Sequence, residues 1–232
     1  MNKHIFCFFH IGSDTSYPQM LVDSIRKFNS NAEIIYCTDR HSPVINGVTR
    51  RLEFIGNPNE MMTYRLKSFA NSGISEPAIY LDTDMLCLKS FDPAKILENK
   101  EIYVCQRSFN KESLFNGNFR GMNYLEYDQM TLGQVYPYLA CATITRNSGM
   151  WAELADACDS LSEKFKIWYG DQEALKIIVK KKSSDQLGLI PEHTYACFPE
   201  ITNYLPQAIF LHFKGAARKG LMGEFYKKIM SL

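Results

Sequence analysis

The sequence carries no excess charge of one sign, no closely spaced cysteine pair and no long apolar run. Lysine and arginine total 26 against 25 aspartate and glutamate, a formal net charge of +1. Proteins that bind nucleic-acid backbones usually have more lysine and arginine than aspartate and glutamate, so nucleic acid is not an expected partner. No apolar stretch is long enough to cross a bilayer. We therefore expect a cytoplasmic protein, with contact at the inner face of a membrane left open.

The seven cysteines are odd in number, and none lies in a Cys-x-x-Cys spacing. That pattern disfavours a disulfide framework and a structural zinc site, so it predicts reduced, mostly buried thiols. Of the 232 residues, 46% are apolar and 22% are charged. A chain of this length and composition is typical of one globular domain with a sizeable core.

Apolar runs typical of buried strands alternate along the chain with segments of helical periodicity. Strands are predicted at 5–9, 34–37, 78–81, 102–105, 139–145 and 208–213, with a weaker one at 48–55. Helices are predicted from Ser16, from a capping box of Asn57, Pro58 and Glu60, along the apolar stripe 151–165, from Gly170 and after Gly220. This alternation predicts an α/β protein with a mostly parallel sheet, whose ligands bind beyond the carboxyl ends of the strands.

Residues 106–138 interrupt this rhythm with a mixture of asparagine, glycine and aromatic side chains. A long irregular stretch inside a compact domain is more often a functional loop than a connection without a function. Four tyrosines of this region either line an acceptor groove or pack the loop itself: Tyr124, Tyr127, Tyr136 and Tyr138.

The motif Asp82-Thr83-Asp84 lies between two apolar segments, 78–81 and 85–88. Two carboxylates at the end of a buried strand are costly unless they are paired or bound to a cation. One interpretation is a capping aspartate beside a salt-bridged aspartate. The other is a divalent-metal site that in turn holds a diphosphate.

His212 closes the last predicted strand and is followed by a glycine-rich basic loop that contains Lys214, Gly215, Arg218 and Lys219. Glycines let backbone N–H groups approach oxygen atoms, and the basic side chains neutralise phosphate charge. An imidazole added to two carboxylates favours Mn²⁺ over Mg²⁺ because it is the softer ligand. The alternative is a basic surface loop that caps the last helix.

Asp171 and Gln172 stand at a predicted helix start, directly after the aromatic turn 168–170. The aspartate is either an ordinary N-cap or part of a sugar-facing site. Arg65, on the helix that precedes the Asp82 strand, either reaches the same site or lies on a solvated helix face.

Four segments together resemble the GT-A class of glycosyltransferases and, within it, are most similar to family 8, the group of glycogenin and bacterial lipooligosaccharide galactosyltransferases. They are 62–67 (MTYRLK), 79–85 (IYLDTDM), 169–175 (YGDQEAL) and 211–215 (LHFKG). One element departs from the family pattern, because the usual Asn-Ala-Gly or Asn-Ser-Gly entering a strand is replaced by 139–142 (LACA), with Asn147-Ser148-Gly149 after the strand.

The resemblance implies a Rossmann-like sheet and a hexosyltransferase that uses Mn²⁺ or Mg²⁺ and a nucleotide-sugar donor, usually a UDP-sugar. It implies a saccharide or glycolipid acceptor, retention of the anomeric configuration, a donor half at 1–105 and an acceptor half at 106–232. The resemblance implies that Asp82, Asp84 and His212 are the metal ligands, with Thr83 in the same motif. It implies that Lys214, Gly215 and Arg218 or Lys219 bind the diphosphate and that Arg65 contacts the donor. It also implies that Asp171 and Gln172 form the catalytic pair near the reacting sugar, and that His10, Ile11 and Gly12 hold the base.

Two other functions remain open from the sequence. A sugar-1-phosphate nucleotidyltransferase would need a glycine-rich basic loop after the first strand, which residues 10–14 do not supply. A catalytically silent nucleotide-sugar-binding module is the alternative outside the enzymes.

Overall fold

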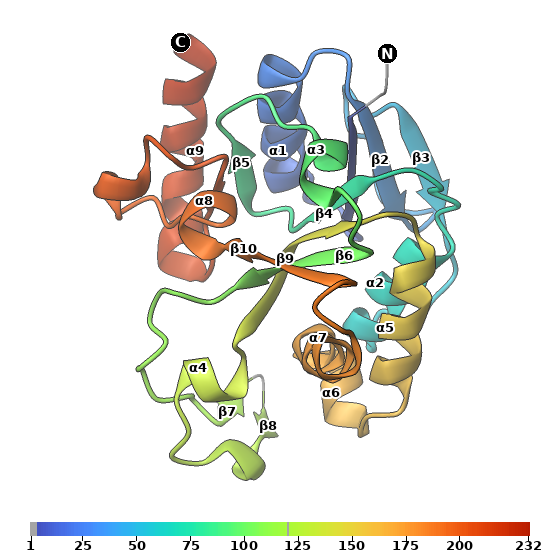
Figure 1. Cartoon of the computed structure of the whole chain (residues 1–232). Coiled ribbons are helices and arrows are strands. Elements are labelled where there is room, and N and C mark those ends of the chain that lie inside the picture. The colour runs from blue at the N-terminus through green and yellow to red at the C-terminus, as the bar shows by residue number, and fades with distance from the viewer. Residues whose placement is uncertain (1–3, 120) are drawn as a thin grey trace.

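The structure is a computed structural model that describes residues 4–119 and 121–232. Its centre is a seven-stranded sheet with the order β10-β6-β9-β4-β1-β2-β3 (Figure 1). The bounds of these strands in chain order are β1 Ile5–Phe9, β2 Glu33–Thr38, β3 Arg50–Glu53, β4 Ala78–Leu81, β6 Ile102–Gln106, β9 Tyr138–Thr145 and β10 Leu187–Pro191. Two smaller ribbons pair β5 Met85–Cys87 with β11 Phe210–His212, and β7 Asn118–Phe119 with β8 Met122–Asn123.

The middle of the sheet is parallel and is covered on both faces. β1 pairs in parallel with β2 and β4, and all five of its residues are buried. Successive residues of a strand point to opposite faces, so Cys7 packs in one core and Phe6 and Phe8 in the other. β9 runs antiparallel to β4 and β6. The expected α/β fold with a mostly parallel sheet is confirmed.

Helices cover both faces of this sheet (Figure 1). α2, α5 and α7 pack in one core, whereas α1 and α3 pack in the other. The helices in chain order are α1 Ser16–Phe28, α2 Met61–Ala70, α3 Pro93–Leu97, α4 Leu132–Val135, α5 Gly149–Asp159, α6 Glu163–Ile167, α7 Gly170–Lys181, α8 Glu192–Tyr195 and α9 Ala216–Ser231, with single 3₁₀ turns η1 Leu125–Tyr127 and η2 Thr202–Tyr204. None of the helices in the described residues combines the length and apolarity that a bilayer crossing requires.

The β5–β11 ribbon joins two distant parts of the chain. β5 follows β4 after only three residues, and it pairs antiparallel with β11, so that Met85 lies opposite His212. Leu86 and Leu211 of the ribbon share a small core with Met222 of α9. The ribbon therefore brings the end of the chain beside the carboxyl end of β4.

The expected capping box at Asn57, Pro58 and Glu60 is wrong. α2 begins only at Met61, with Glu60 at the N-cap position. The Asn57 side chain instead accepts a hydrogen bond from the backbone N–H of Asn59 at 3.0 Å and donates one to Glu60. Asparagine side chains favour such local turns, which compete with helical hydrogen bonding.

The single helix expected along 151–165 is also wrong, because the chain forms α5 and α6 with a break at 160–162. Ser160 donates its hydroxyl to the carbonyl of Ala157 at 2.7 Å, a local bond that replaces helical continuation. The break lets Phe165 turn away from the core below the sheet into a separate aromatic cluster. β10 was not expected either, since its short sequence contains Gly188 and Pro191, which weaken a strand pattern.

The irregular region forms a separate lobe, which we call the aromatic lobe (residues 107–119 and 121–136). Its rings pack together with those of α6 and its neighbourhood, and the buried cluster contains Phe115, Tyr124, Val135, Tyr136 and Phe165. Tyr127 packs against this cluster, and Tyr138 opens β9 and packs against the core of α2, α5 and α7. Tyr124, Tyr127 and Tyr136 therefore pack within the lobe, as in the second interpretation, whereas Tyr138 packs against the main core. All seven cysteines are buried, which agrees with the expectation that they are mostly buried.

Candidate metal and anion site

The three candidate metal ligands lie together at the carboxyl end of β4. Asp82 directly follows β4, Asp84 precedes β5, and His212 lies opposite Met85 on β11. One ligand atom from each of these three side chains lies within 4.8 Å of the others. The backbone N–H of Phe213 donates to the carbonyl of Asp84 at 2.8 Å, which holds the two strand ends together.

Asp84 is surrounded by positive charge. Its carboxylate lies 3.5 Å from Nε2 of His212 and 3.1 Å from Nζ of Lys219. Burial raises the pKa of Asp84, but His212 and Lys219 outweigh burial and hold that pKa well below its ordinary value. Burial lowers the pKa of His212, but the Cys141 thiol and the Asp84 carboxylate together raise it to about 10. The site thus keeps Asp84 ionised, as a cation ligand must be, whereas His212 would have to release its proton to bind a cation.

Arg65 links the metal-ligand cluster to α7. One Nη atom lies 2.6 Å from Asp82 Oδ1, and the other pairs with Asp171 Oδ2. The Arg65 side chain is 13% exposed and that of Asp171 is 8% exposed. Burial raises the pKa of Asp171, although Arg65 acts in the opposite direction. The solvated helix face considered for Arg65 and the N-cap considered for Asp171 therefore do not apply, since Tyr169 is the N-cap residue of α7.

The basic side chains that follow β11 contact different acidic partners. Lys219 reaches Asp84, whereas Arg218 pairs with Glu200 and lies over the Phe198 ring, 3.9 Å from its centroid. Lys214 is exposed, and Gly215 has φ +87°, a left-handed conformation that suits glycine. Of the two alternatives, Lys219 is the side chain that the structure brings to the metal-ligand cluster.

Residues 10–12 follow β1 at the same edge of the sheet, on the side toward β2. Burial lowers the pKa of His10, whose Nε2 atom is buried without a hydrogen-bond partner in the described residues. Ile11 packs against the core, and the backbone N–H of Gly12 donates to Ser42 Oγ at 2.8 Å. In the described part of the chain, these residues make no hydrogen bond or ion pair with the metal-ligand cluster.

The donor set fits a divalent cation. Two carboxylates and one imidazole are ligands that Mn²⁺ accepts, and a first-row ion bound at about 2.1 Å holds its ligand atoms at most about 4.2 Å apart. The three ligand atoms lie within 4.8 Å of one another, so the side chains need to move only slightly closer together to bind such an ion. Arg65 and Lys219 already pair with Asp82 and Asp84, so a bound cation would share these carboxylates with two protein side chains. The residues present therefore fit a divalent cation.

Two residues near the site were missed by the sequence reasoning. The carbonyl of Cys141, inside the segment 139–142 that departs from the family pattern, accepts the backbone N–H of Asp82 at 3.0 Å. Glu192, which is 1% exposed, accepts the backbone N–H groups of Ser108 and Phe109 at 2.6 and 2.7 Å and so anchors the start of the aromatic lobe. Neither has a local sequence signal, because each acts through a segment far away along the chain.

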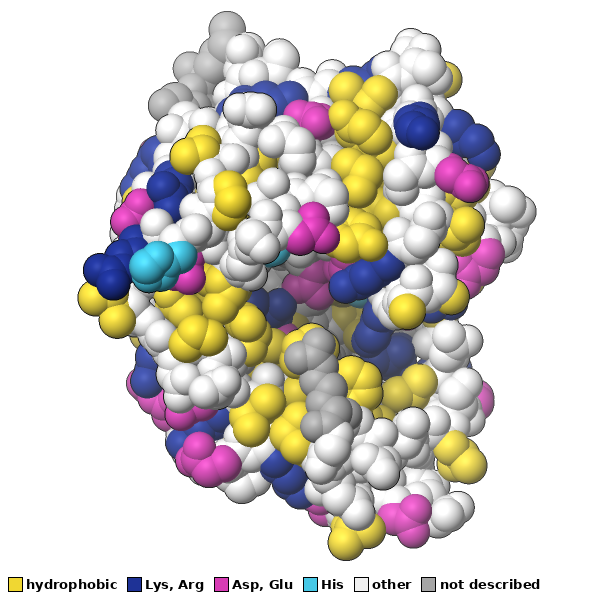
Figure 2. Space-filling view, turned by 180° about the vertical axis from the view of Figure 1, so that it is seen from behind, with side chains coloured by type: hydrophobic (Ala, Val, Ile, Leu, Met, Phe, Trp, Pro, Cys, Tyr) yellow, Lys and Arg dark blue, Asp and Glu magenta, His cyan; other side chains and the backbone are white. Residues whose placement is uncertain are grey.

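The face of the molecule opposite that of Figure 1 is hollowed near its centre (Figure 2). Acidic and basic side chains gather in and around this hollow, and apolar side chains border it. A concave surface of mixed charge with apolar walls suits a polar ligand of moderate size.

No protein-family model and no curated protein matches the sequence. Three glycosyltransferases of solved structure are similar to it in fold. One is involved in the glycosylation of the major capsid of PBCV-1, with 10% identity, a TM-score of 0.62 and full coverage of both chains. GlyE of Streptococcus pneumoniae TIGR4 has 14% identity, a TM-score of 0.60 and coverage of 100% of this chain and 63% of that one. An active-site mutant of LgtC has 13% identity, a TM-score of 0.58 and coverage of 98% and 95%.

The chain has the GT-A glycosyltransferase fold. At 10–14% identity the likeness concerns the fold, and the activity has to be argued from the site. This chain also spans less than two thirds of the GlyE chain.

Proposed function

We propose that the protein is a metal-dependent glycosyltransferase that transfers a hexose from a nucleotide-sugar donor, a UDP-sugar, to a saccharide or glycolipid acceptor. The observation that carries this proposal is the convergence of Asp82, Asp84 and His212 within 4.8 Å at the carboxyl end of β4. These ligands come from two distant parts of the chain, and in an α/β sheet this edge is where ligands bind. The solved glycosyltransferases of similar fold support the same class of reaction.

The residues around the metal-ligand cluster supply the other roles. A divalent cation held by Asp82, Asp84 and His212 would act as a Lewis acid on the diphosphate leaving group. Lys219 and Lys214 neutralise the negative charge that grows on this diphosphate as the glycosidic bond breaks. Thr83 and Gly215 belong to the backbone segments that approach the donor.

The catalytic pair of the proposal is Asp171 and Gln172 at the start of α7. Arg65 holds the Asp171 carboxylate against the Asp82 side of the cluster, where the donor sugar would lie. The Gln172 Oε1 atom is buried and has no hydrogen-bond partner in the described residues, so it is available to a sugar hydroxyl. His10, Ile11 and Gly12 hold the base, and the resemblance to family 8 supports retention of the anomeric configuration.

The acceptor half of the proposal is residues 106–232, with the donor half at 1–105. The aromatic lobe begins directly after β6, so it borders the same sheet edge as the metal-ligand cluster. An acceptor bound between the lobe and α7 would present its hydroxyl group to the donor sugar.

The proposal is tested with a panel of UDP-, GDP-, CMP- and TDP-sugars, each with and without Mn²⁺. We expect a UDP-sugar to raise the melting temperature only when Mn²⁺ is present, because a ligand that binds the folded state stabilises it. We also expect slow, Mn²⁺-dependent release of UDP from the same donor. No stabilisation by any nucleotide sugar would contradict the proposal. Release of pyrophosphate from a nucleoside triphosphate and a sugar phosphate would identify a nucleotidyltransferase, and binding without UDP release would identify a silent binding module.

A further inference from the structure

Tyr169 has a backbone conformation that is unusual for its residue type. It is the N-cap residue of α7, with φ 66° and ψ −4° in the left-handed region. Three other described residues that are not glycine also have positive φ, namely Glu98, Asn110 and Gln129, and none of them is aromatic. A bulky side chain in this region is strained and persists only where the surrounding structure imposes it.

The aromatic lobe supplies the contacts that can impose this conformation. The ring of Tyr169 stacks on Tyr136, with centroids 4.8 Å apart and planes at 26°. It also meets the edges of Tyr124 and Phe115, at 5.4 and 5.6 Å. Aromatic pairs with these geometries are attractive beyond the area that they bury. The ring is therefore held by the lobe, while its backbone belongs to α7.

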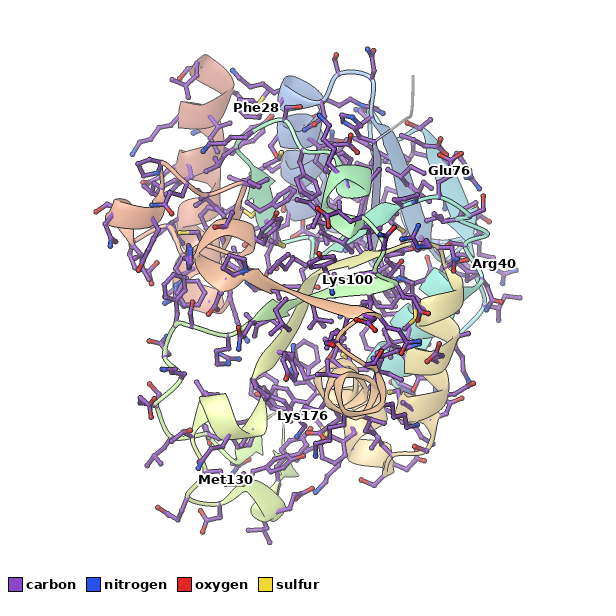
Figure 3. All side chains as sticks on the ribbon, viewed as in Figure 1. Phe28, Arg40, Glu76, Lys100, Met130 and Lys176 are labelled. Carbon is purple, nitrogen blue, oxygen red and sulfur yellow. The ribbon has the colours of Figure 1, made fainter. Side chains whose placement is uncertain are left out.

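The lobe is attached to α7 a second time, one turn further along the helix. The Tyr127 hydroxyl donates a hydrogen bond to Glu173, and the Lys176 ammonium lies 2.8 Å from the same carboxylate. Lys176 also lies over the rings of Tyr127 and Tyr136, 4.9 and 5.3 Å from their centroids. Figure 3 shows Lys176 on the side of α7 that faces the lobe. These contacts keep the lobe and the first turns of α7 in one arrangement.

The left-handed residue lies just before the proposed catalytic pair along the chain. Asp171 is only two residues beyond Tyr169, and its carboxylate pairs with Arg65 and accepts the Gln172 N–H at 2.7 Å. A return of φ at residue 169 to the ordinary range near −60° would rotate the following chain by roughly 130°. Gly170 cannot absorb that rotation freely, since a Cβ there would lie 2.3 Å from the Phe165 carbonyl oxygen, so the backbone is already packed tightly.

We propose that Tyr169 is a positioning residue: the aromatic lobe holds its ring, the ring holds its backbone left-handed, and that turn places Asp171 and Gln172 at the donor site. The lobe thereby controls donor turnover without contacting the donor. The kinetic part of this inference rests on the proposed function. Its structural part concerns the turn alone and does not depend on activity.

The decisive comparison is between Tyr169→Gly and Tyr169→Ala. Both remove the ring, but glycine adopts the left-handed turn without strain whereas alanine does not. We expect Tyr169→Ala to lower the rate of Mn²⁺-dependent UDP-sugar hydrolysis, measured without acceptor, by at least about tenfold, and Tyr169→Gly by about threefold or less. Tyr169→Phe keeps the ring, so its rate of hydrolysis should stay close to that of the unaltered protein. Binding of Mn²⁺ with UDP should change less than about twofold in all three, because its ligands lie on other elements.

A second pair tests the lobe contact at a distance from Tyr169. Lys176→Met removes the ion pair with the buried Glu173, and Lys166→Met removes an equivalent i,i+3 pair with the exposed Glu163 on α6. The two lysines are exposed to nearly the same extent, 18% and 19%. We expect Lys176→Met to lower donor hydrolysis by about threefold to fivefold with unchanged Mn²⁺ and UDP binding, and Lys166→Met to have no effect.

Amide hydrogen exchange over 169–175 gives a readout that needs no activity. We expect faster exchange in Tyr169→Ala and Lys176→Met than in Tyr169→Gly and Lys166→Met. Equal exchange and equal hydrolysis in the alanine and glycine variants would overturn the inference. If the unaltered protein neither binds Mn²⁺ with UDP nor hydrolyses any donor, the proposed function fails instead, and the exchange pattern still decides whether the lobe holds the turn.

Discussion

The aromatic lobe and the sheet edge that carries Asp82 differ in how their residues are brought together. At the sheet edge, Arg65, Asp82, Asp171 and His212 come from four separate elements, and each is delivered by a buried strand or helix. The lobe consists of one continuous segment whose regular elements are at most four residues long. Its rings pack mainly against each other and against α6 and the start of α7.

Because of this difference, we expect the two regions to respond differently to amino-acid substitutions. Polar side chains at the sheet edge form mostly buried ion pairs, so substitutions there directly change the charge and the ligand binding of the site. The lobe has a small core of its own, and such a region opens more easily than a central sheet. Substitutions in the lobe therefore act through local order.

The strongest test of the sheet edge is Asp84→Ala. It removes a metal ligand and leaves His212 and Lys219 without their shared partner. We expect donor hydrolysis at saturating Mn²⁺ to fall by about 10³-fold or more, since a metal contributes several kcal/mol to such a step. The matched control is Glu112→Ala, an exposed carboxylate of the lobe, which should leave the rate unchanged. A rate near that of the unaltered protein in Asp84→Ala would remove the proposed metal role.

The contrast in stability is tested by one aromatic substitution in each region. Trp151 is 1% exposed and contacts Phe69 and Tyr80 beneath the sheet. We expect Trp151→Ala to lower the free energy of unfolding by about 3–5 kcal/mol and the melting temperature by about 10 °C.

Phe115→Ala, in the lobe, should instead accelerate amide exchange over the lobe and leave the main unfolding transition nearly unchanged. Chemical denaturation followed by far-UV circular dichroism measures the first effect, and amide exchange measures the second. A Phe115→Ala protein destabilised as strongly as Trp151→Ala would show that the lobe unfolds together with the sheet.

Gly170→Ala tests the junction between the two regions. A methyl group there would meet the Phe165 carbonyl oxygen at 2.3 Å and Cys158 Sγ at 2.6 Å, so the start of α7 must shift. We expect a loss of about 1–3 kcal/mol of stability together with reduced donor hydrolysis. Gly220→Ala on α9 is the control, because a methyl group there meets nothing within 4 Å and alanine favours a helix. Equal effects of the two substitutions would contradict the tight junction.

The smallest expected effect concerns the basic loop. Lys219→Ala should weaken Mn²⁺-dependent UDP binding by about tenfold, or about 1.4 kcal/mol, through loss of a phosphate contact. Arg218→Ala should change the same binding less than about twofold, since Arg218 is engaged by Glu200 and Phe198. Calorimetry measures both, and the reverse ranking would place Arg218 at the diphosphate.

The strands of the sheet were predictable because they are continuously apolar and bounded by polar residues. β1, β2, β4, β6 and β9 all lie where the apolar runs indicated, within one or two residues. The predicted start of α2 failed because the Asn57 side chain makes a local turn that a capping pattern resembles. The break between α5 and α6 was missed because the apolar spacing continues through it, although its members pack in two different cores.

The candidate site was predictable as a set of residue types and only partly as an arrangement. Two aspartates at a strand end and a histidine before a basic glycine loop indicate a cation and an anion by their chemistry. Whether Arg218 or Lys219 faces Asp84 depends on how α9 leaves β11, which no local pattern contains. The same holds for Tyr127, Glu173 and Lys176, whose contacts cross from the lobe to α7.

The order of apolar runs and the identity of the polar residues that follow them are properties of the chain alone, and they were enough to indicate a mostly parallel α/β sheet with a candidate metal site at one edge. The pairing of Arg65 with two carboxylates, the choice of Lys219 and the left-handed turn at Tyr169 were decided by tertiary packing. The physical reason is the range of each interaction. Apolar periodicity and local hydrogen bonding depend on neighbours in sequence, whereas a charge finds its partner only after the core has brought distant segments together.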